Sequence, residues 1–463
     1  MNAAVTSREL VEVDDLRIGM FIHLDMNWMS HPFPLGSFRI ADAEQIATIR
    51  SLGVQRVRWS PTQSDPLLET TGWGRATDFD RLAPKSAEAA PASPAAGLPA
   101  VEAEAAQEPA DAVASAAAIA AIAESPEVAA RNQHRRALAA QRAAQQLCER
   151  QFSEAARDCK QLTDLVPGKP KEARQQAETL SKALVDKMLV DQDMCIRLLT
   201  DAAGDKASAH AMNVTVISLL MGRSFGLLEA DMMDLGVGAM LHDIGKLDLP
   251  DRVRHRDDQF SGAELRFYEE HVAHGVGHAR KMGLSAGATI VIAQHHEHAD
   301  GSGFPQRLNT DRMTAASRIV ALVNRYDNLC NPHIAARALT PHESLSLLFA
   351  QGKSKFDTAI LGAFIRMMGV YPAGSTVQLT DDRYAMVVGV NSSRPLKPRV
   401  LVHEPKVPRD EALIVDLETT PGLGIRRSIK PQQLPLESLE YLAPRPRVAY
   451  FFEAVPRNDE AAV

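Results

Sequence analysis

The sequence has 463 residues, 45% of them hydrophobic and 24% charged, which is typical of a globular protein with two or three domains. Its formal net charge of −7 argues against a broad attraction to nucleic acid polymers or anionic lipid, although it allows a local basic pocket for a small phosphate ligand. Four scattered cysteines without CxxC spacing argue against a disulfide framework or a thiolate zinc site: Cys148, Cys159, Cys195 and Cys330.

The N-terminal residues 1–82 predict a small α+β module. GMFIHL, SFRI and VQRVRW are strand-like runs, and ADAEQIATIRSLG is amphipathic and ends in glycine. From 83 to 126 the composition shifts to Ala, Pro, Glu and Ser, with six prolines. Such a segment cannot bury enough surface to offset its ordering entropy, so we expect a disordered linker there.

Helices dominate the predicted middle of the chain. Residues 127–206 predict connecting helices, broken by Pro-Gly-Lys-Pro at 167–170 and resuming toward Thr200. Residues 207–370 show repeated amphipathic helices with short polar turns, which indicates an all-helical core. The last part, 371–463, contains the β-rich segments STVQLTDDRYAMVVGV, PRVLVHE and EALIVDL and predicts a β-rich appendage. The predicted fold class is therefore mainly α.

Neither the N-terminal residues nor the alanine-rich stretch predicts membrane targeting. The N-terminus carries acidic residues where a secretory signal needs an apolar core. The alanine-rich stretch at 114–123 is far short of the ~20 apolar residues of a membrane span. We therefore expect a cytoplasmic protein.

Histidines and a carboxylate recur through the predicted helical core. They are His210, the pair His242 and Asp243 in LHDIGK, His271 in EEHVAHG, and His295 and His296 in HHEHADGSGFP. Imidazole and carboxylate together suit divalent transition metals, and a carboxylate can bridge two ions, which makes Asp243 the candidate bridge. Two ions ~3.5–4 Å apart would activate a shared water for in-line displacement at phosphorus. Each histidine alone is more often packed or solvated than a ligand; the ordered set carries the prediction.

These motifs resemble the HD-GYP family of bacterial cyclic di-GMP phosphodiesterases, a branch of the HD metal-hydrolase superfamily. The resemblance covers about 207–370, and HDIGK at 242–246 and HHEHADGSGFP at 295–305 are its most specific parts. The tail segment YPAGSTVQL is also similar to the family. VDDLRIGMFIHLDMNWMSHPFP resembles the small module often found ahead of such domains in Gram-negative bacteria.

The resemblance implies a set of site residues. Two divalent transition metal ions, such as Fe or Mn, would be held by His210, His242, Asp243, His271, His295 and His296. Lys246 would contact the substrate phosphate, where an ammonium can neutralise charge developing on phosphoryl oxygens. The loop containing Gly303, Phe304 and Pro305 would close over the site.

Four positions depart from the family pattern. Asn324 falls where the family has an aspartate ligand, and a neutral amide oxygen binds metal less tightly, so the site could hold a single ion. His333 falls where an arginine contacts phosphate, which weakens phosphate recognition. Phe304 replaces a tyrosine and loses its hydroxyl. Lys206 stands where members with a third metal carry glutamate, so we do not expect a trinuclear site.

Two functions stay open from the sequence, and the first is favoured. It is a metal-dependent phosphodiesterase of second-messenger signalling, which opens cyclic di-GMP to linear pGpG; whether the reaction continues to GMP stays open. The alternative is a catalytically weakened HD-GYP protein that binds cyclic di-GMP or a protein partner such as a GGDEF domain. A helical scaffold with incidental histidines is the least favoured. The expected partners include a second copy of the chain and exclude nucleic acid polymers.

Overall fold

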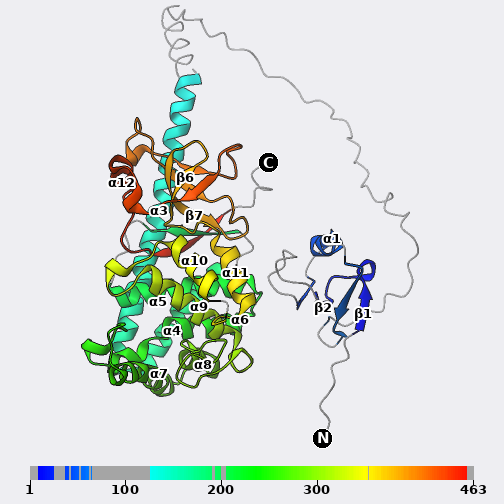
Figure 1. The fold of residues 1–463 in the computed structure, drawn as a ribbon, viewed down its shortest axis with the longest axis vertical. Coiled ribbons are helices and arrows are strands. Elements are labelled where there is room, and N and C mark those ends of the chain that lie inside the picture. The colour runs from blue at the N-terminus through cyan, green and yellow to red at the C-terminus, as the bar shows by residue number, and fades with distance from the viewer. Residues whose placement is uncertain are drawn as a thin grey trace, which may run out of the picture. The chain divides into compact units, whose positions relative to one another are not determined.

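The computed structural model describes residues 9–24, 37–40, 43–51, 54–61, 64, 126–189, 193–199, 205–352 and 354–455. The chain divides into two compact units (Figure 1). The small N-terminal sheet belongs to the first unit, and every residue from 135 onward belongs to the second. The linker predicted at 83–126 lies outside the described residues except for Pro126, where helix α3 begins.

The N-terminal unit contains a four-stranded antiparallel sheet, which confirms the predicted α+β character. Its strands lie in the order β1-β4-β2-β3. The elements are β1 (Glu9–Glu12), η1 (Val13–Asp15), β2 (Phe21–His23), β3 (Ser37–Arg39), α1 (Ala43–Ser51) and β4 (Arg56–Trp59). Its small core is formed by apolar residues of β2, α1 and β4, where Ile22, Ile49 and Val57 are buried.

The second unit begins with helices. They are α3 (Pro126–Leu165), α4 (Pro170–Met188), α5 (Lys206–Ser224), α6 (Glu229–Met240), α7 (Gly262–Met282), α8 (Ala286–Gln294), α9 (Ala315–Cys330), α10 (Pro341–Gln351) and α11 (Thr358–Met368). Short 3-10 turns connect several of them: η4 (Ile244–Asp248), η5 (Asp251–Val253), η6 (Thr310–Arg312) and η7 (Ala335–Arg337). The prediction of a helical region here is confirmed.

Local signals set the ends of the helices that carry the site. The Asp205 side chain accepts hydrogen bonds from the first backbone amides of α5. Ser261 and Glu264 form a capping box at the start of α7, and Gly283 ends that helix in the left-handed conformation. Helix α5 is buried on nearly every face, as expected of a helix at the centre of a bundle.

The second unit also contains a seven-stranded antiparallel sheet. One of its strands, β5, corrects the sequence prediction. The strands are β5 (Asp193–Leu198), β6 (Thr376–Leu379), β7 (Tyr384–Asn391), β8 (Arg399–Val402), β9 (Ile414–Asp416), β10 (Ile425–Ser428) and β11 (Tyr450–Val455), with η8 (Arg409–Glu411), η9 (Pro431–Gln433) and α12 (Leu436–Leu442). Their order is β10-β6-β7-β5-β11, with β8 on β7 and β9 on β8. Helix was predicted to continue toward Thr200, but α4 ends at Met188 and β5 pairs with β7 and β11.

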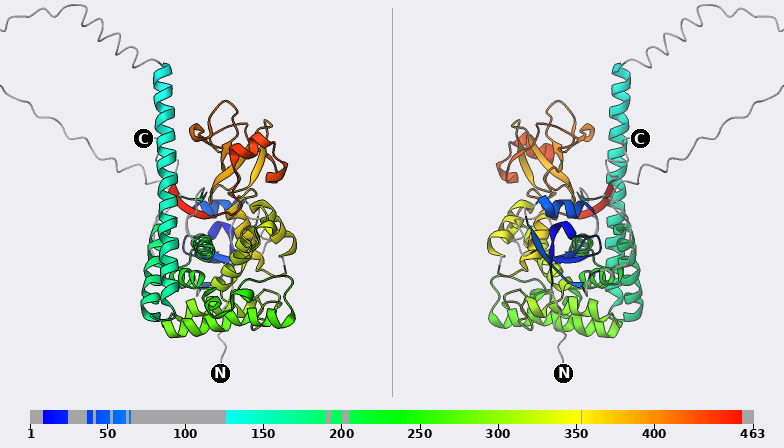
Figure 2. Two further views of the ribbon diagram at one scale, coloured as in Figure 1. Left: turned by 90° about the vertical axis from the view of Figure 1, so that its left-hand side faces the viewer. Right: turned by 90° about the vertical axis from the view of Figure 1, so that its right-hand side faces the viewer.

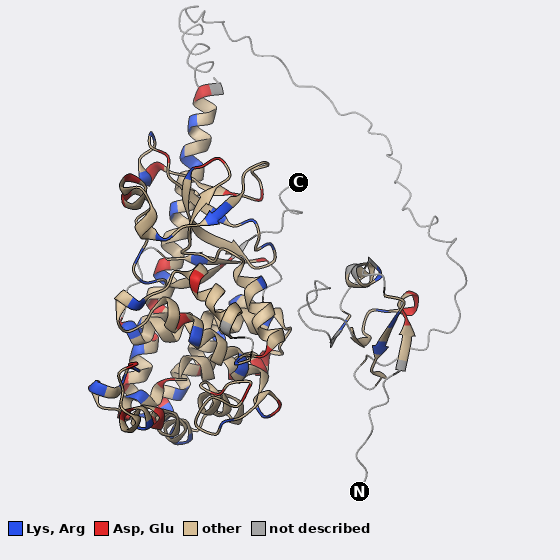
Figure 3. Cartoon of the chain, viewed as in Figure 1, with Lys and Arg blue, Asp and Glu red and all other residues tan. Residues whose placement is uncertain are grey.

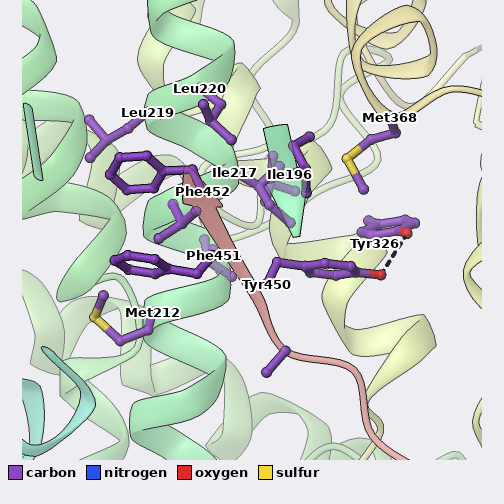
Figure 4. Packing of buried hydrophobic residues seen from close by; sticks show 14 of the residues in the cluster. Ile196, Met212, Ile217, Leu219, Leu220, Tyr326, Met368, Tyr450, Phe451 and Phe452 are labelled. Atoms are coloured by element: carbon purple, nitrogen blue, oxygen red, sulfur yellow. Dashed lines mark hydrogen bonds between the residues drawn. The ribbon is translucent and has the colours of Figure 1, made fainter. Parts of the chain in front are cut away.

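The helices and the sheet share one hydrophobic core. A single cluster of buried residues includes Phe152 of α3, Ile217 of α5, Tyr326 of α9 and Phe451 of β11. Figure 4 shows the aromatic side chains of β11 lying against residues of α5, with the hydroxyls of Tyr326 and Tyr450 in hydrogen-bond contact. Consequently the β-rich region is packed into the helical core.

Helix α3 runs beside both the helices and the sheet of this unit (Figures 1 and 2). Its Phe152 ring packs edge-on against Phe451, and its Gln141 side chain donates to the backbone oxygen of Ala412 at 3.1 Å. Basic and acidic residues are interspersed over the helices and strands (Figure 3). Within the described part of the chain, no helix combines the length and apolarity that crossing a bilayer requires.

Candidate metal centre

Four helices and their C-terminal turns bring the predicted ligands together. His210 lies in α5, His242 and Asp243 directly follow α6, His271 lies in α7, and His295 and His296 follow α8. The glycine of the HDIGK motif allows this convergence. A Cβ atom on Gly245 would lie 1.9 Å from the backbone oxygen of His271, so only glycine lets this turn lie directly on α7.

The two carboxylate oxygens of Asp243 face separate sets of imidazoles. Its Oδ2 atom lies 3.7 Å from Nε2 of His210 and 3.4 Å from Nε2 of His242. Its Oδ1 atom lies 3.6 Å from Nε2 of His271 and 3.6 Å from Nε2 of His295. The ligand atoms form two groups that share Asp243: His210, His242 and Asp243, and Asp243, His271, His295 and His296. Asp243 therefore occupies the place of a bridging ligand.

Hydrogen bonds on the outer side of the rings fix which nitrogen faces the centre. Nδ1 of His242, His271 and His295 each contacts the backbone oxygen three residues earlier, at 2.7, 2.5 and 2.8 Å. Nδ1 of His210 contacts Oδ2 of Asp327 at 2.6 Å. Because carbonyl and carboxylate oxygens only accept, these Nδ1 atoms carry the hydrogen, and the Nε2 lone pairs point inward.

The inner atoms of the cluster fit a cation. Nε2 of His210 lies 3.2 Å from Nε2 of His242, and Nε2 of His271 lies 3.4 Å from Nε2 of His295. With both Nδ1 atoms protonated, each pair brings two lone pairs together. Among the described residues, the buried Oδ1 of Asp243 and Nε2 of His296 have no hydrogen-bond partner. Acceptors that face one another in a buried site need a positive charge between them, so the donor set is that of a divalent metal site.

Burial keeps the ligands in the protonation states that bind metal. It lowers the pKa of His271 to about 3, and it also lowers the pKa of His242 and of His296. Burial alone would raise the pKa of Asp243, but Lys246 and His242 outweigh it and hold that pKa well below the ordinary value. At neutral pH these imidazoles are neutral and the carboxylate is charged.

Lys246 lies beside Asp243 of this cluster. Its Nζ donates to Oδ2 of Asp243 at 2.6 Å and lies 5.6 Å from the ring centroid of Tyr268. Tyr268 is buried, and its own pKa is raised by that burial. The sequence reading did not single out Tyr268. Its position three residues before His271 in α7 places both on one helix face, and that spacing was the available signal.

The loop DGSGFP at 300–305, called the signature loop below, packs against the predicted ligand His296. The Phe304 ring stacks on the His296 ring with centroids 4.5 Å apart, and the backbone nitrogen of Phe304 donates to the His296 oxygen at 3.1 Å. A Cβ atom on Gly303 would lie 2.5 Å from that same oxygen, so the close approach requires glycine. Pro305 follows Phe304 through a cis peptide bond.

Glu297 holds this loop and was not predicted. Its side chain is fully buried, and its two carboxylate oxygens accept hydrogen bonds from the backbone nitrogens of Gln306 at 2.6 Å and Leu308 at 2.8 Å. The only sequence signal was an acidic residue directly after a histidine pair. A buried carboxylate with two amide donors is an anchor for the backbone.

Asn324 and His333, two of the positions that depart from the family pattern, contact residues outside the histidine cluster. Asn324 is buried in α9, and its side-chain oxygen accepts from Nδ2 of Asn328 at 2.6 Å. His333 is exposed and stacks on His255, with ring centroids 4.1 Å apart and planes inclined by 12°. His333 belongs to neither metal-ligand group. The structure thus brings six predicted ligands, Lys246 and the signature loop together, and leaves His333 in a separate stack.

Residues 193–360 match the family model described as an HD domain. Residues 9–177 match a model described as a domain of unknown function, DUF3391. The chain is similar to Cyclic di-GMP phosphodiesterase PA4108 of Pseudomonas aeruginosa, with 26% identity over 42% of this chain and 47% of the relative. It is also similar to Cyclic di-GMP phosphodiesterase PdeB of Borreliella burgdorferi, with 22% identity over 50% of this chain and 62% of the relative. The predicted resemblance to HD-GYP phosphodiesterases is confirmed.

One solved structure is weakly similar to this chain. Bd1817, a HDG"Y"P protein from Bdellovibrio bacteriovorus, has 13% identity and a TM-score of 0.37, and the match covers 77% of this chain and 98% of that chain. The curated relatives are matched over only about half to three fifths of their own length.

Proposed function

We propose that the HD domain is a metal-dependent phosphodiesterase that hydrolyses cyclic di-GMP to linear pGpG and then to GMP. The observation that carries this proposal is Asp243, whose two carboxylate oxygens each face a separate pair of inward-pointing imidazoles. Both relatives described above are named cyclic di-GMP phosphodiesterases, which supports the choice of substrate.

The protein's own groups would perform three tasks in this reaction. The imidazoles and Asp243 would hold two divalent ions such as Fe or Mn. Bound ions would supply Lewis acidity toward the phosphoryl oxygens and a nucleophile derived from water. Lys246, beside Asp243, would neutralise charge that develops on the phosphoryl group, which is worth most in a buried site. The signature loop would cover the site, with Phe304 holding the His296 ring in place.

Asp243→Ala tests the proposed chemistry, because it removes both carboxylate oxygens that would bridge the two ions. The purified protein, loaded with Mn or Fe, is incubated with cyclic di-GMP, and the linear products are followed by chromatography. We expect wild type to release pGpG and Asp243→Ala to lose metal and turnover together. Wild-type protein that contains metal and leaves cyclic di-GMP intact would contradict the proposal.

A second candidate function is a weakened HD-GYP protein that binds cyclic di-GMP or a GGDEF-domain partner. It rests on Asn324, whose neutral side-chain oxygen already accepts a hydrogen bond from Asn328, and on the exposed stack of His333 with His255. Binding without turnover by wild type, combined with hydrolysis by Asn324→Asp, would favour this candidate over the first.

A further inference from the structure

A buried carboxylate connects the metal ligand His210 to the end of the chain. Asp327 in α9 has no exposed surface. Its Oδ2 accepts the Nδ1 hydrogen of His210 at 2.6 Å. Its Oδ1 accepts from Nδ2 of Asn213 at 2.8 Å and from Nδ2 of Asn331 at 2.9 Å. Both oxygens of the buried charge are therefore satisfied by three side chains, two from α5 and one from the end of α9.

The two asparagines are in turn held by the backbone that leads into β11. Asn331 accepts from the Val448 nitrogen at 2.9 Å and donates to the Val448 oxygen at 2.9 Å. Asn213 accepts from the Tyr450 nitrogen at 3.0 Å and donates to the same Val448 oxygen at 3.0 Å. Each carboxamide thus links the backbone at 448–450 to the Asp327 carboxylate. Its oxygen accepts from a backbone nitrogen, and its nitrogen donates to both the Val448 oxygen and Asp327.

We propose that the Val448–Tyr450 backbone, acting through Asn213 and Asn331, positions the His210 imidazole for metal binding. The inference rests on the metal-dependent function proposed above. The physical reason is that an imidazole ligand needs an acceptor on its outer nitrogen to fix its tautomer and its orientation. Asp327 is that acceptor, and the two asparagines supply the donors that keep its buried charge satisfied and fixed in direction.

The arrangement differs at the other ligands. His242, His271 and His295 take their outer acceptor from a backbone oxygen three residues earlier, within their own helix or at its end. Those contacts form as soon as the helix forms. His210 alone among these four takes its outer acceptor from a side chain, and that acceptor, Asp327, lies 117 positions away in the sequence. The position of His210 is therefore the one that a distant segment can change.

Asn331→Ala tests the inference, with metal affinity as the readout. Affinity for Mn is measured by competition with a chelating indicator, and bound Mn is counted per chain. We expect Asn331→Ala and Asn213→Ala to bind one Mn about 10–100-fold more weakly than wild type. Asp327→Asn preserves shape and should give the same loss, which keeps the test valid if an alanine variant folds poorly.

Asn391→Ala is the matched control, because Asn391 lies at the end of β7 and bonds to Ser393 and Asp193 away from the cluster. It should lower the thermal stability of the metal-free protein and leave Mn affinity at the wild-type value. Wild-type Mn affinity in folded Asn331→Ala and Asp327→Asn would overturn the inference and leave these residues a purely structural role. Weaker Mn binding in those variants, in a protein that never hydrolyses cyclic di-GMP, would uphold the inference and reject the proposed function.

Discussion

At the scale of single residues, Asn324 carries a neutral amide where the family pattern has a charged aspartate. An aspartate there would add a buried carboxylate at the position where the family pattern has a metal ligand, and a carboxylate binds hard and borderline cations better than an amide. We expect Asn324→Asp to tighten binding of one metal ion by roughly tenfold, which is about 1.4 kcal/mol, and to raise turnover. Metal competition and product analysis measure both effects.

Asn309→Asp is the control for this change, because it adds the same charge at an exposed position outside the cluster. It should leave metal affinity unchanged. If both variants tighten binding equally, long-range charge would explain the effect, and Asn324 would have no special place in the site.

The individual residues of the site were predictable to different degrees. The six ligands and Lys246 stand in motifs whose spacing marks them in the sequence. Asp327 was not among the predicted site residues, whereas the structure shows its hydrogen bond to His210. That role depends on contacts between α5, α9 and the backbone before β11, and no local pattern encodes such a meeting. Glu297 was passed over because its partners are backbone amides, which every residue has.

At the scale of elements, the signature loop is held by close backbone contacts. A Cβ atom at position 303 would lie 2.4 Å from the His298 nitrogen and 2.5 Å from the His296 oxygen. We expect Gly303→Ala to cost about 1–3 kcal/mol of unfolding free energy, as other overpacked sites do, and to weaken substrate binding by moving Phe304. Urea unfolding measures the first effect, and KM measures the second.

Gly277→Ala supplies the matched comparison. This glycine lies within α7, and a Cβ atom there would meet no atom within 4 Å. Alanine in a helix interior is favoured over glycine by about 1 kcal/mol, so this variant should gain stability. A loss in Gly277→Ala equal to that in Gly303→Ala would show that steric crowding is not the cause.

The buried imidazoles also give the helical core a dependence on pH. The pKa of His271 is about 3 in the folded protein and 6.5 ordinarily. Between these values the unfolded chain binds a proton that the folded chain refuses, so the unfolding free energy of the metal-free protein should fall as pH decreases from 6.5 toward 3. Chelator-treated protein unfolded by urea at several pH values tests this. His271→Gln should show a shallower decline, and an unchanged slope would contradict the assignment.

Strand β5 shows where element prediction failed. The run DMCIRL follows a helical pattern and was predicted to continue it, but it forms a nearly continuously buried strand with a partner strand on each side. A short apolar run gives no period that separates a central strand from a buried helix. Only the distant partners β7 and β11 decide between the two.

At the scale of the whole molecule, the shared core makes the helices and the sheet one cooperative structure. Phe451 of β11 is 1% exposed and belongs to the same cluster as α5 and α9. We expect Phe451→Ala to cost about 3–5 kcal/mol and to speed amide hydrogen exchange in α9 as much as in β7. Leu436→Ala, at a side chain 68% exposed, should change neither. Faster exchange confined to the sheet would mean that the two parts unfold independently.

The broad division of the chain was accessible from composition, since helical, β-rich and Pro-rich stretches differ in residue content. The exact domain boundaries remain predictions. What composition could not reveal is that the β-rich region incorporates β5 and shares its core with the helices, because such sharing arises from long-range packing.

The position of β5 between β7 and β11 has a consequence for synthesis on the ribosome. A nascent chain exposes β5 long before either neighbour has been translated, so this apolar segment must wait without its partners until the last strand emerges. Premature termination ahead of residue 448 would leave β5 with an open edge and Asp327 without its anchored asparagines. Incomplete polypeptides would therefore be targets for chaperones and proteases rather than enzymes with reduced output.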